Sequence, residues 1–157
     1  MRRFGQKRES STGVPGPLPQ AGISPGGVVT ECYCGNGHNL VNGKVRFDGH
    51  AGIVVRLNNT SGEGLLTLSP VLGDLRREFS GIEPVTWEIV DISCPVCRAP
   101  LPVYDLCSCG APLVSLFLTP NAEFARCIGI CQRIGCLHSE IKSTRDLRIF
   151  SRLGYFG

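Results

Sequence analysis

Nine cysteines, gathered into four short clusters, constrain this chain of 157 residues more than any other feature of its sequence. Within a cluster, neighbouring cysteines are separated by one to four residues. Each cluster can therefore bring at least two ligand side chains to one point within a tight turn. The clusters are Cys32-Tyr-Cys34-Gly-Asn-Gly-His38, Cys94-Pro-Val-Cys97, Cys107-Ser-Cys109-Gly110 and Cys127-x3-Cys131-x4-Cys136-x-His138.

These cysteines favour metal binding over disulfides. Their number is odd, they stand in short pairs, and the residues after Arg2 and Arg3 lack the apolar segment of an export signal. Thiolates at such spacing suit tetrahedral structural sites, so we predict Zn²⁺ and treat iron as the less favoured metal. Because free thiols persist in reducing compartments, we expect a cytoplasmic protein.

We predict two zinc sites, each held by four side chains. Glycines support the turns: Gly35 and Gly110 directly follow a cysteine, and Gly37 precedes a histidine. Glycine tolerates a left-handed backbone, which lets the chain curl around a metal ion. The predicted metal ligands are Cys34, His38, Cys94, Cys97, Cys107, Cys109, Cys131 and Cys136.

The stretch from Cys94 to Leu113, CPVCRAPLPVYDLCSCGAPL, resembles a compact zinc ribbon of the rubredoxin-like knuckle class. It departs from that class at Arg98, where a glycine is usual, and in the single residue between Cys107 and Cys109. The resemblance implies that the second and third clusters share one ion, so that the first and fourth share the other. A second pairing joins the first cluster with the second and the third with the fourth. The sequence does not decide, and we favour the compact pairing.

Two cysteines remain as spares. We expect Cys32 and Cys127 to be small apolar core residues. Alternatively, Cys32 could replace His38 as a ligand, and Cys127 could replace Cys131. His138 is a further candidate ligand because of its place in the fourth cluster.

Apolar alternation from Lys44 onward predicts a mainly β fold, a small antiparallel sheet with zinc-ribbon hairpins. The stretch Asp74–Phe79 has the length of one helical turn. Strand-like patterns cover Val45–Phe47, Ile53–Leu57, Leu65–Leu68, Val85–Ile92, Leu101–Tyr104 and Leu113–Leu118.

The pattern divides the chain into three parts. Residues 1–29 are rich in Pro, Gly and Ser and predict a flexible N-terminal extension. Residues 30–140 form the predicted zinc-bound β domain. Residues 141–157 predict a short amphipathic C-terminal helix or tail, because apolar residues there recur at helical spacing between arginines.

Function is expected to lie at the surface. Closed four-ligand zinc sites stabilise a fold, so we expect an accessory or scaffold subunit whose partner is a larger protein complex. No catalytic motif, small-molecule site or membrane span is recognised, so we expect no enzyme. A zinc-ribbon nucleic-acid-binding protein is the first alternative, although two Zn²⁺ ions held by seven thiolates would bring the formal charge from +3 to about zero. A rubredoxin-like electron carrier is the second.

Overall fold

The structure is a computed structural model that describes residues 21–137 and 139–142. Residues 1–20 of the predicted N-terminal extension and residues 143–157 of the predicted C-terminal helix or tail lie outside these ranges, whereas residues 141–142 end the strand β10 (Ser139–Lys142). The described chain contains strands and no helix, which confirms the mainly β fold class. No segment of it forms a helix with the length and hydropathy that a membrane crossing requires.

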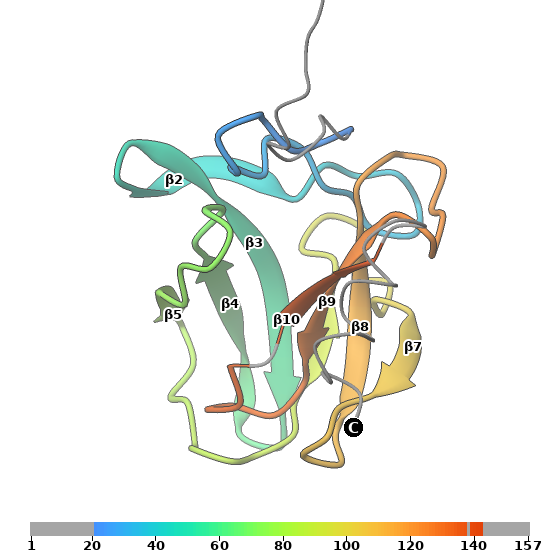
Figure 1. Ribbon diagram of the computed structural model, residues 1–157. Helices are drawn as coiled ribbons and strands as arrows, with labels where there is room; N and C mark the ends of the chain where they lie inside the picture. Colours follow the sequence, from blue (N-terminus) through green and yellow to red (C-terminus); the bar gives the residue numbers. More distant parts are fainter. Residues whose placement is uncertain (1–20, 138, 143–157) are drawn as a thin grey trace, which may run out of the picture.

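Two antiparallel sheets make up the fold (Figure 1). The first has the strand order β2-β3-β4-β5, and β6 pairs with the part of β3 that extends beyond its pairing with β2. Its strands are β2 (Val41–Phe47), β3 (His50–Asn59), β4 (Gly62–Leu68), β5 (Arg77–Ser80) and β6 (Asp91–Ser93). The second has the order β10-β9-β8-β7, with β7 (Val103–Leu106), β8 (Pro112–Phe117), β9 (Cys127–Cys131) and β10 (Ser139–Lys142).

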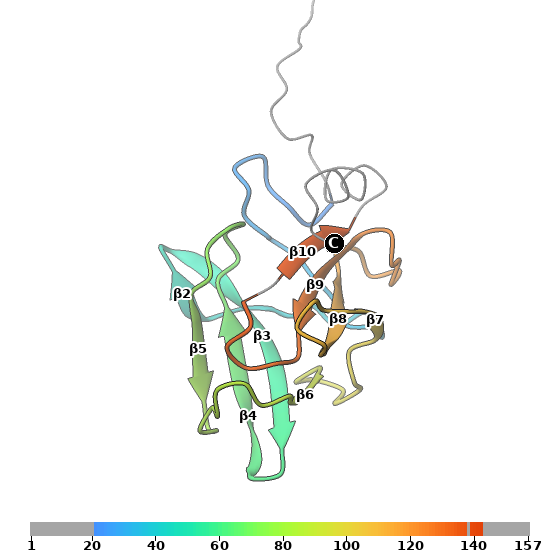
Figure 2. The same ribbon diagram turned by 60° about the horizontal axis from the view of Figure 1, so that its bottom comes forward.

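One hydrophobic core is shared by the two sheets. Val55 and Leu57 of β3 are fully buried in the same cluster as Leu116 of β8 and Ile130 of β9. Figure 2 shows β3 and β4 running alongside the strands of the second sheet. Removing apolar surface from water at this contact holds the sheets together, since each has one apolar face to cover.

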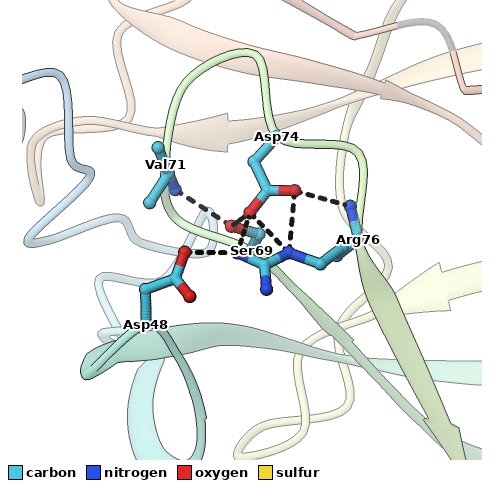
Figure 3. A network of polar contacts seen from close by, with 5 residues as sticks. All are labelled: Asp48, Ser69, Val71, Asp74 and Arg76. Atoms are coloured by element: carbon cyan, nitrogen blue, oxygen red, sulfur yellow. Dashed lines mark hydrogen bonds and ion pairs between the residues drawn. The ribbon is translucent and has the colours of Figure 1, made fainter.

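The connection between β4 and β5 is closed by a polar network (Figure 3). The Asp74 carboxylate accepts a hydrogen bond of 2.7 Å from Ser69 Oγ and one of 3.1 Å from the backbone N–H of Arg76. The Arg76 guanidinium lies between two carboxylates, with Nη2 2.7 Å from Asp74 and 2.6 Å from Asp48. These contacts hold the pKa of Asp74 well below its usual range, chiefly through the Arg76 side chain.

Two segments differ from the sequence prediction. The strand predicted over Val85–Ile92 is wrong for most of its length. Only its last two residues belong to a strand, β6, and Trp87 has a φ of +75°. A left-handed residue breaks the alternation of a strand. The helical turn considered for Asp74–Phe79 is also wrong, because its second half is the edge strand β5.

Residues 21–29, within the predicted extension, are paired with the β domain. Val28 forms a bridge with Val71, and the Val29 N–H donates to the Pro70 carbonyl at 2.8 Å. Val29 is 3% exposed and belongs to the shared core. This segment therefore covers the edge of the core beside the loop that follows β4.

Candidate metal centres

The first group of candidate ligands joins the first and second cysteine clusters. Ligand atoms of Cys34, His38, Cys94 and Cys97 all lie within 4.8 Å of one another. Cys34 Sγ is 3.8 Å from Cys97 Sγ and 3.4 Å from His38 Nδ1. Three sulfur atoms and one imidazole nitrogen therefore converge on one point.

The second group joins the third and fourth clusters. It consists of Cys107, Cys109, Cys131 and Cys136, whose sulfur atoms also lie within 4.8 Å of one another. The Cys107 and Cys136 sulfur atoms are 3.7 Å apart, and those of Cys109 and Cys131 are 3.5 Å apart. The second group thus offers four sulfur ligands.

These distances fit tetrahedral metal sites and exclude disulfides. A Zn–S bond of about 2.3 Å places two sulfur ligands of a regular tetrahedron roughly 3.8 Å apart. A Zn–N bond of about 2.0 Å gives a sulfur–nitrogen separation of roughly 3.5 Å. A disulfide would need about 2.05 Å between the sulfur atoms, and all nine cysteines are free. The two groups therefore have room for one ion each.

Backbone N–H groups point at the sulfur atoms, as they do in metal knuckles. Cys34 Sγ accepts hydrogen bonds of 3.3 Å from Asn36 N and 3.4 Å from His38 N. Cys94 Sγ accepts one from Val96 N, and Cys131 Sγ accepts one from Arg133 N. Such donors stabilise the negative charge of a thiolate, so these turns favour the ionised form of the cysteines.

The positions of the ligand residues are set by the strands beside them. Cys94 directly follows β6 on the first sheet, whereas the turn that begins at Cys34 is tied to β8 through the bridge between Tyr33 and Phe117. The first group therefore links the two sheets. Cys107 follows β7 and Cys131 ends β9, and both strands flank β8. The second group therefore joins strands of one sheet.

Left-handed residues close the turns beside the ligands. Gly37 precedes His38 with a φ of +85°, Gly110 follows Cys109 with +97°, and Gly135 precedes Cys136 with +94°. Arg98 takes the same conformation after Cys97, with a φ of +64°, at the position where the sequence departs from the ribbon pattern. Gly35 is not among the left-handed residues, so its predicted role in the turn is wrong.

Each group combines an acidic thiol with one that resists ionisation. Hydrogen bonds from the Ala99 backbone and the Asn36 side chain lower the pKa of Cys97 to about 6, whereas burial raises that of Cys94 to about 11. Burial also raises the pKa of Cys109, but hydrogen bonds from the Ala111 backbone and the Arg133 guanidinium outweigh it and bring the value to about 6.

In the second group, burial raises the pKa of Cys131 far above its usual range. A thiol of this kind becomes a thiolate readily only when a cation compensates its charge. Each group therefore contains one thiol that ionises near neutral pH and one whose ionisation a bound cation would favour.

The compact pairing favoured from the sequence is wrong in this structure. The eight predicted ligands are brought together, but Cys94 and Cys97 meet the first cluster rather than Cys107 and Cys109. The physical reason is strand pairing. β7 pairs with β8 and carries the third cluster to the end of β9, while β6 stays on β3.

The two spare cysteines lie outside both groups. Cys32 and Cys127 are each 0% exposed, and burial raises the pKa of the Cys32 thiol far above its usual range. Cys127 Sγ donates to the Phe124 carbonyl at 3.4 Å. Neither takes the place of a predicted ligand in the groups of the described chain. His138 lies outside the described residues.

Two residues beside the sulfur atoms were missed by the sequence reasoning. Asn36 Nδ2 donates to Cys97 Sγ at 3.4 Å, and Arg133 Nε donates to Cys109 Sγ at the same distance. Asn36 lies within the first knuckle and Arg133 lies two residues after Cys131. Proximity to a ligand in sequence was the available signal, although it does not tell which sulfur atom each side chain reaches.

Comparisons with protein-family models, with curated proteins and with solved structures found no match to this chain.

Proposed function

We propose that this chain binds two structural zinc ions and acts as an accessory or scaffold subunit of a larger protein assembly. The observation that carries the proposal is the pair of four-ligand groups, in each of which the ligand atoms all lie within 4.8 Å of one another. Each group takes its ligands from clusters far apart in the sequence. An ion in either group would therefore stabilise the folded chain and not the unfolded one.

The donor set favours zinc over iron. A rubredoxin-like iron site uses four thiolates, and only the second group offers four. The first group contains His38, and a set of three cysteines with one histidine is a common structural zinc set. One metal that suits both groups is the simpler account.

A scaffold role is supported by the closed ligand sets and by the exposed apolar surface. Four protein ligands leave no open position for a substrate or for an activated water. Val85 and Trp87 are each 54% exposed, and Ile89 is 46% exposed, all in the segment that leads into β6. Apolar side chains gathered in one exposed segment are a feature of protein contact sites.

Metal analysis of the full chain, purified without added metal, tests the first half of this proposal. We expect close to two zinc ions per chain and a colourless protein. A folded, metal-free chain would refute zinc binding, and a red protein that contains iron would favour the electron carrier.

Size-exclusion chromatography of a native extract tests the second half. We expect the chain to elute with a partner, well above its own mass of 16.9 kDa. Elution as a free monomer at every salt concentration would contradict a scaffold role.

A further inference from the structure

Arg133 connects the second ligand group to an exposed tryptophan. Its Nε donates to Cys109 Sγ at 3.4 Å, and one Nη atom donates to the Cys109 carbonyl at 3.3 Å. Its other Nη atom donates to the Trp87 carbonyl at 3.0 Å. The guanidinium carbon lies 5.1 Å from the centre of the Trp87 ring, in a cation–π contact. One side chain thus contacts a predicted metal ligand, a backbone turn and an indole ring.

Trp87 is held in an unusual conformation. It has a φ of +75°, which a bulky side chain adopts only where surrounding contacts enforce it. Its N–H donates to the Ile134 carbonyl at 2.6 Å, and the neighbouring Ile89 bridges to Arg133. Every one of these contacts comes from residues 133–134, which lie between the ligands Cys131 and Cys136.

The charge of the second group explains why an arginine stands there. A zinc ion with four thiolates carries two net negative charges, whereas a zinc ion with three thiolates and a neutral histidine carries one. Beside the first group, the side-chain donor to sulfur is the neutral amide of Asn36. Beside the second, it is the guanidinium of Arg133.

A second cation, Arg77, faces the same group from β5. Arg77, Cys131 and Arg133 line one small cavity between the sheets. Arg77 Nε is buried and has no hydrogen-bond partner among the described residues. Burial lowers the pKa of the Arg77 guanidinium, and the nearby Cys136 and Cys131 partly offset that effect. A buried cation without a carboxylate partner is costly unless negative charge lies nearby. Two positive charges therefore face a centre expected to carry two negative ones.

We infer that Arg133 is a positioning residue that secures the second metal centre and makes the exposed conformation of Trp87 depend on that centre being filled. This inference rests on the proposed zinc binding. It extends that proposal by assigning the two centres different roles. The first joins the sheets, and the second also sets the shape of the surface around Trp87.

The test compares zinc-loaded full chains of the wild type, Arg133→Gln and Arg98→Gln during titration with a chelator. Arg98 is the matched control, because it adjoins the ligand Cys97 but its ion pair is with Glu63, at 3.7 Å. Two quantities are followed: the zinc retained per chain, and the fluorescence of Trp87, the only tryptophan in the sequence.

For Arg133→Gln we expect one zinc ion to be lost at a chelator concentration about 10- to 100-fold lower than in the wild type, with the other unaffected. The emission of the loaded variant should be displaced toward that of the zinc-free wild type. Arg98→Gln should match the wild type in both quantities. Circular dichroism shows whether Arg133→Gln folds. If it does not, the zinc retained and the Trp87 fluorescence are measured for Arg133→Lys instead, because lysine keeps the positive charge but not the fork of hydrogen-bond donors.

The inference is overturned if the folded Arg133 variant retains both ions like the wild type, or if its Trp87 emission is unchanged. A wild-type chain that takes up no zinc would instead overturn the proposed zinc binding itself. The two failures are therefore distinguishable.

Discussion

At the scale of single residues, two glycines that follow a cysteine differ in their backbone conformation. Gly110, after Cys109, has a φ of +97°, whereas Gly35, after Cys34, is outside the left-handed region. An added Cβ at Gly35 would meet its nearest neighbour, Pro102 Cγ, at an ordinary 3.7 Å. The two positions therefore form a matched pair for testing how the knuckle turns are stabilised.

We predict that Gly110→Ala lowers the free energy of unfolding of the zinc-loaded chain by about 1 kcal/mol, because alanine is strained in the left-handed region. Gly35→Ala should change it little. Denaturant unfolding of both variants measures the difference. Equal losses at the two positions would show that the left-handed turn at Gly110 does not matter for stability.

Asp74 is the residue whose ionisation should matter for the loop between β4 and β5. Its folded-state pKa is held below the ordinary value, chiefly by the Arg76 side chain, so its carboxylate stabilises the fold above about pH 4 and loses that effect as the pH falls through the folded pKa. We predict that Asp74→Asn melts at a lower temperature than the wild type. The same change at Asp48, whose side chain is 69% exposed, should have a smaller effect.

Thermal melts of the two asparagine variants and the wild type at about pH 7 and about pH 5.5 check this. The gap between Asp74→Asn and the wild type should be the same at both pH values, because both lie above the range in which the carboxyl titrates. A gap that closes between these values would contradict the low pKa.

At the scale of elements, close approach between strands limits side-chain size at Gly64 of β4. An added Cβ there would lie 2.4 Å from the Ser80 carbonyl of β5 and 2.7 Å from Ile82 Cβ. We predict that Gly64→Ala destabilises the chain by about 1–3 kcal/mol, since the edge strand must move. Gly26→Ala, whose Cβ would meet nothing closer than 3.9 Å, is the control. Denaturant unfolding measures both, and similar effects would contradict the role given to this contact.

The strands were predictable where alternation or a buried apolar run marked them. Ile53–Leu57 and Leu113–Leu118 correspond to parts of β3 and β8. β9 was missed because its sequence, CIGIC, contains a central glycine and two cysteines, which read as knuckle rather than strand. Gly129 is small because Tyr104 of β7 lies over it, with its hydroxyl where a Cβ would stand. That contact depends on the sheet order, which no local pattern reveals.

The candidate site was also predictable only in part. The eight residues that the structure brings together could be predicted, because cysteine and histidine at knuckle spacing carry the ligand chemistry in their side chains. Their pairing could not, because it depends on β7 joining β8 while β6 joins β3. The contact of Arg133 with Cys109 could not be predicted either, since it links residues 24 positions apart in the sequence.

At the scale of the whole molecule, the two groups differ in what they hold together. The pairing seen in the structure predicts how many zinc ions each double variant loses. Cys94→Ser with Cys97→Ser removes two ligands of the first group alone, so one ion should remain. Cys97→Ser with Cys109→Ser removes one ligand from each group, so a chelator that leaves the wild type loaded should strip both ions. Zinc analysis after chelation reads the difference, and one ion retained in the second variant would instead support the compact pairing.

The central claim is that seven sulfur atoms and one imidazole nitrogen surround two zinc ions in this chain. X-ray absorption at the zinc edge of the folded, full-length protein tests it most directly. The account predicts a sulfur shell at about 2.3 Å that averages between three and four atoms per zinc, with a small nitrogen contribution at about 2.0 Å. A shell made only of oxygen and nitrogen, or a folded chain that contains no zinc, would contradict it.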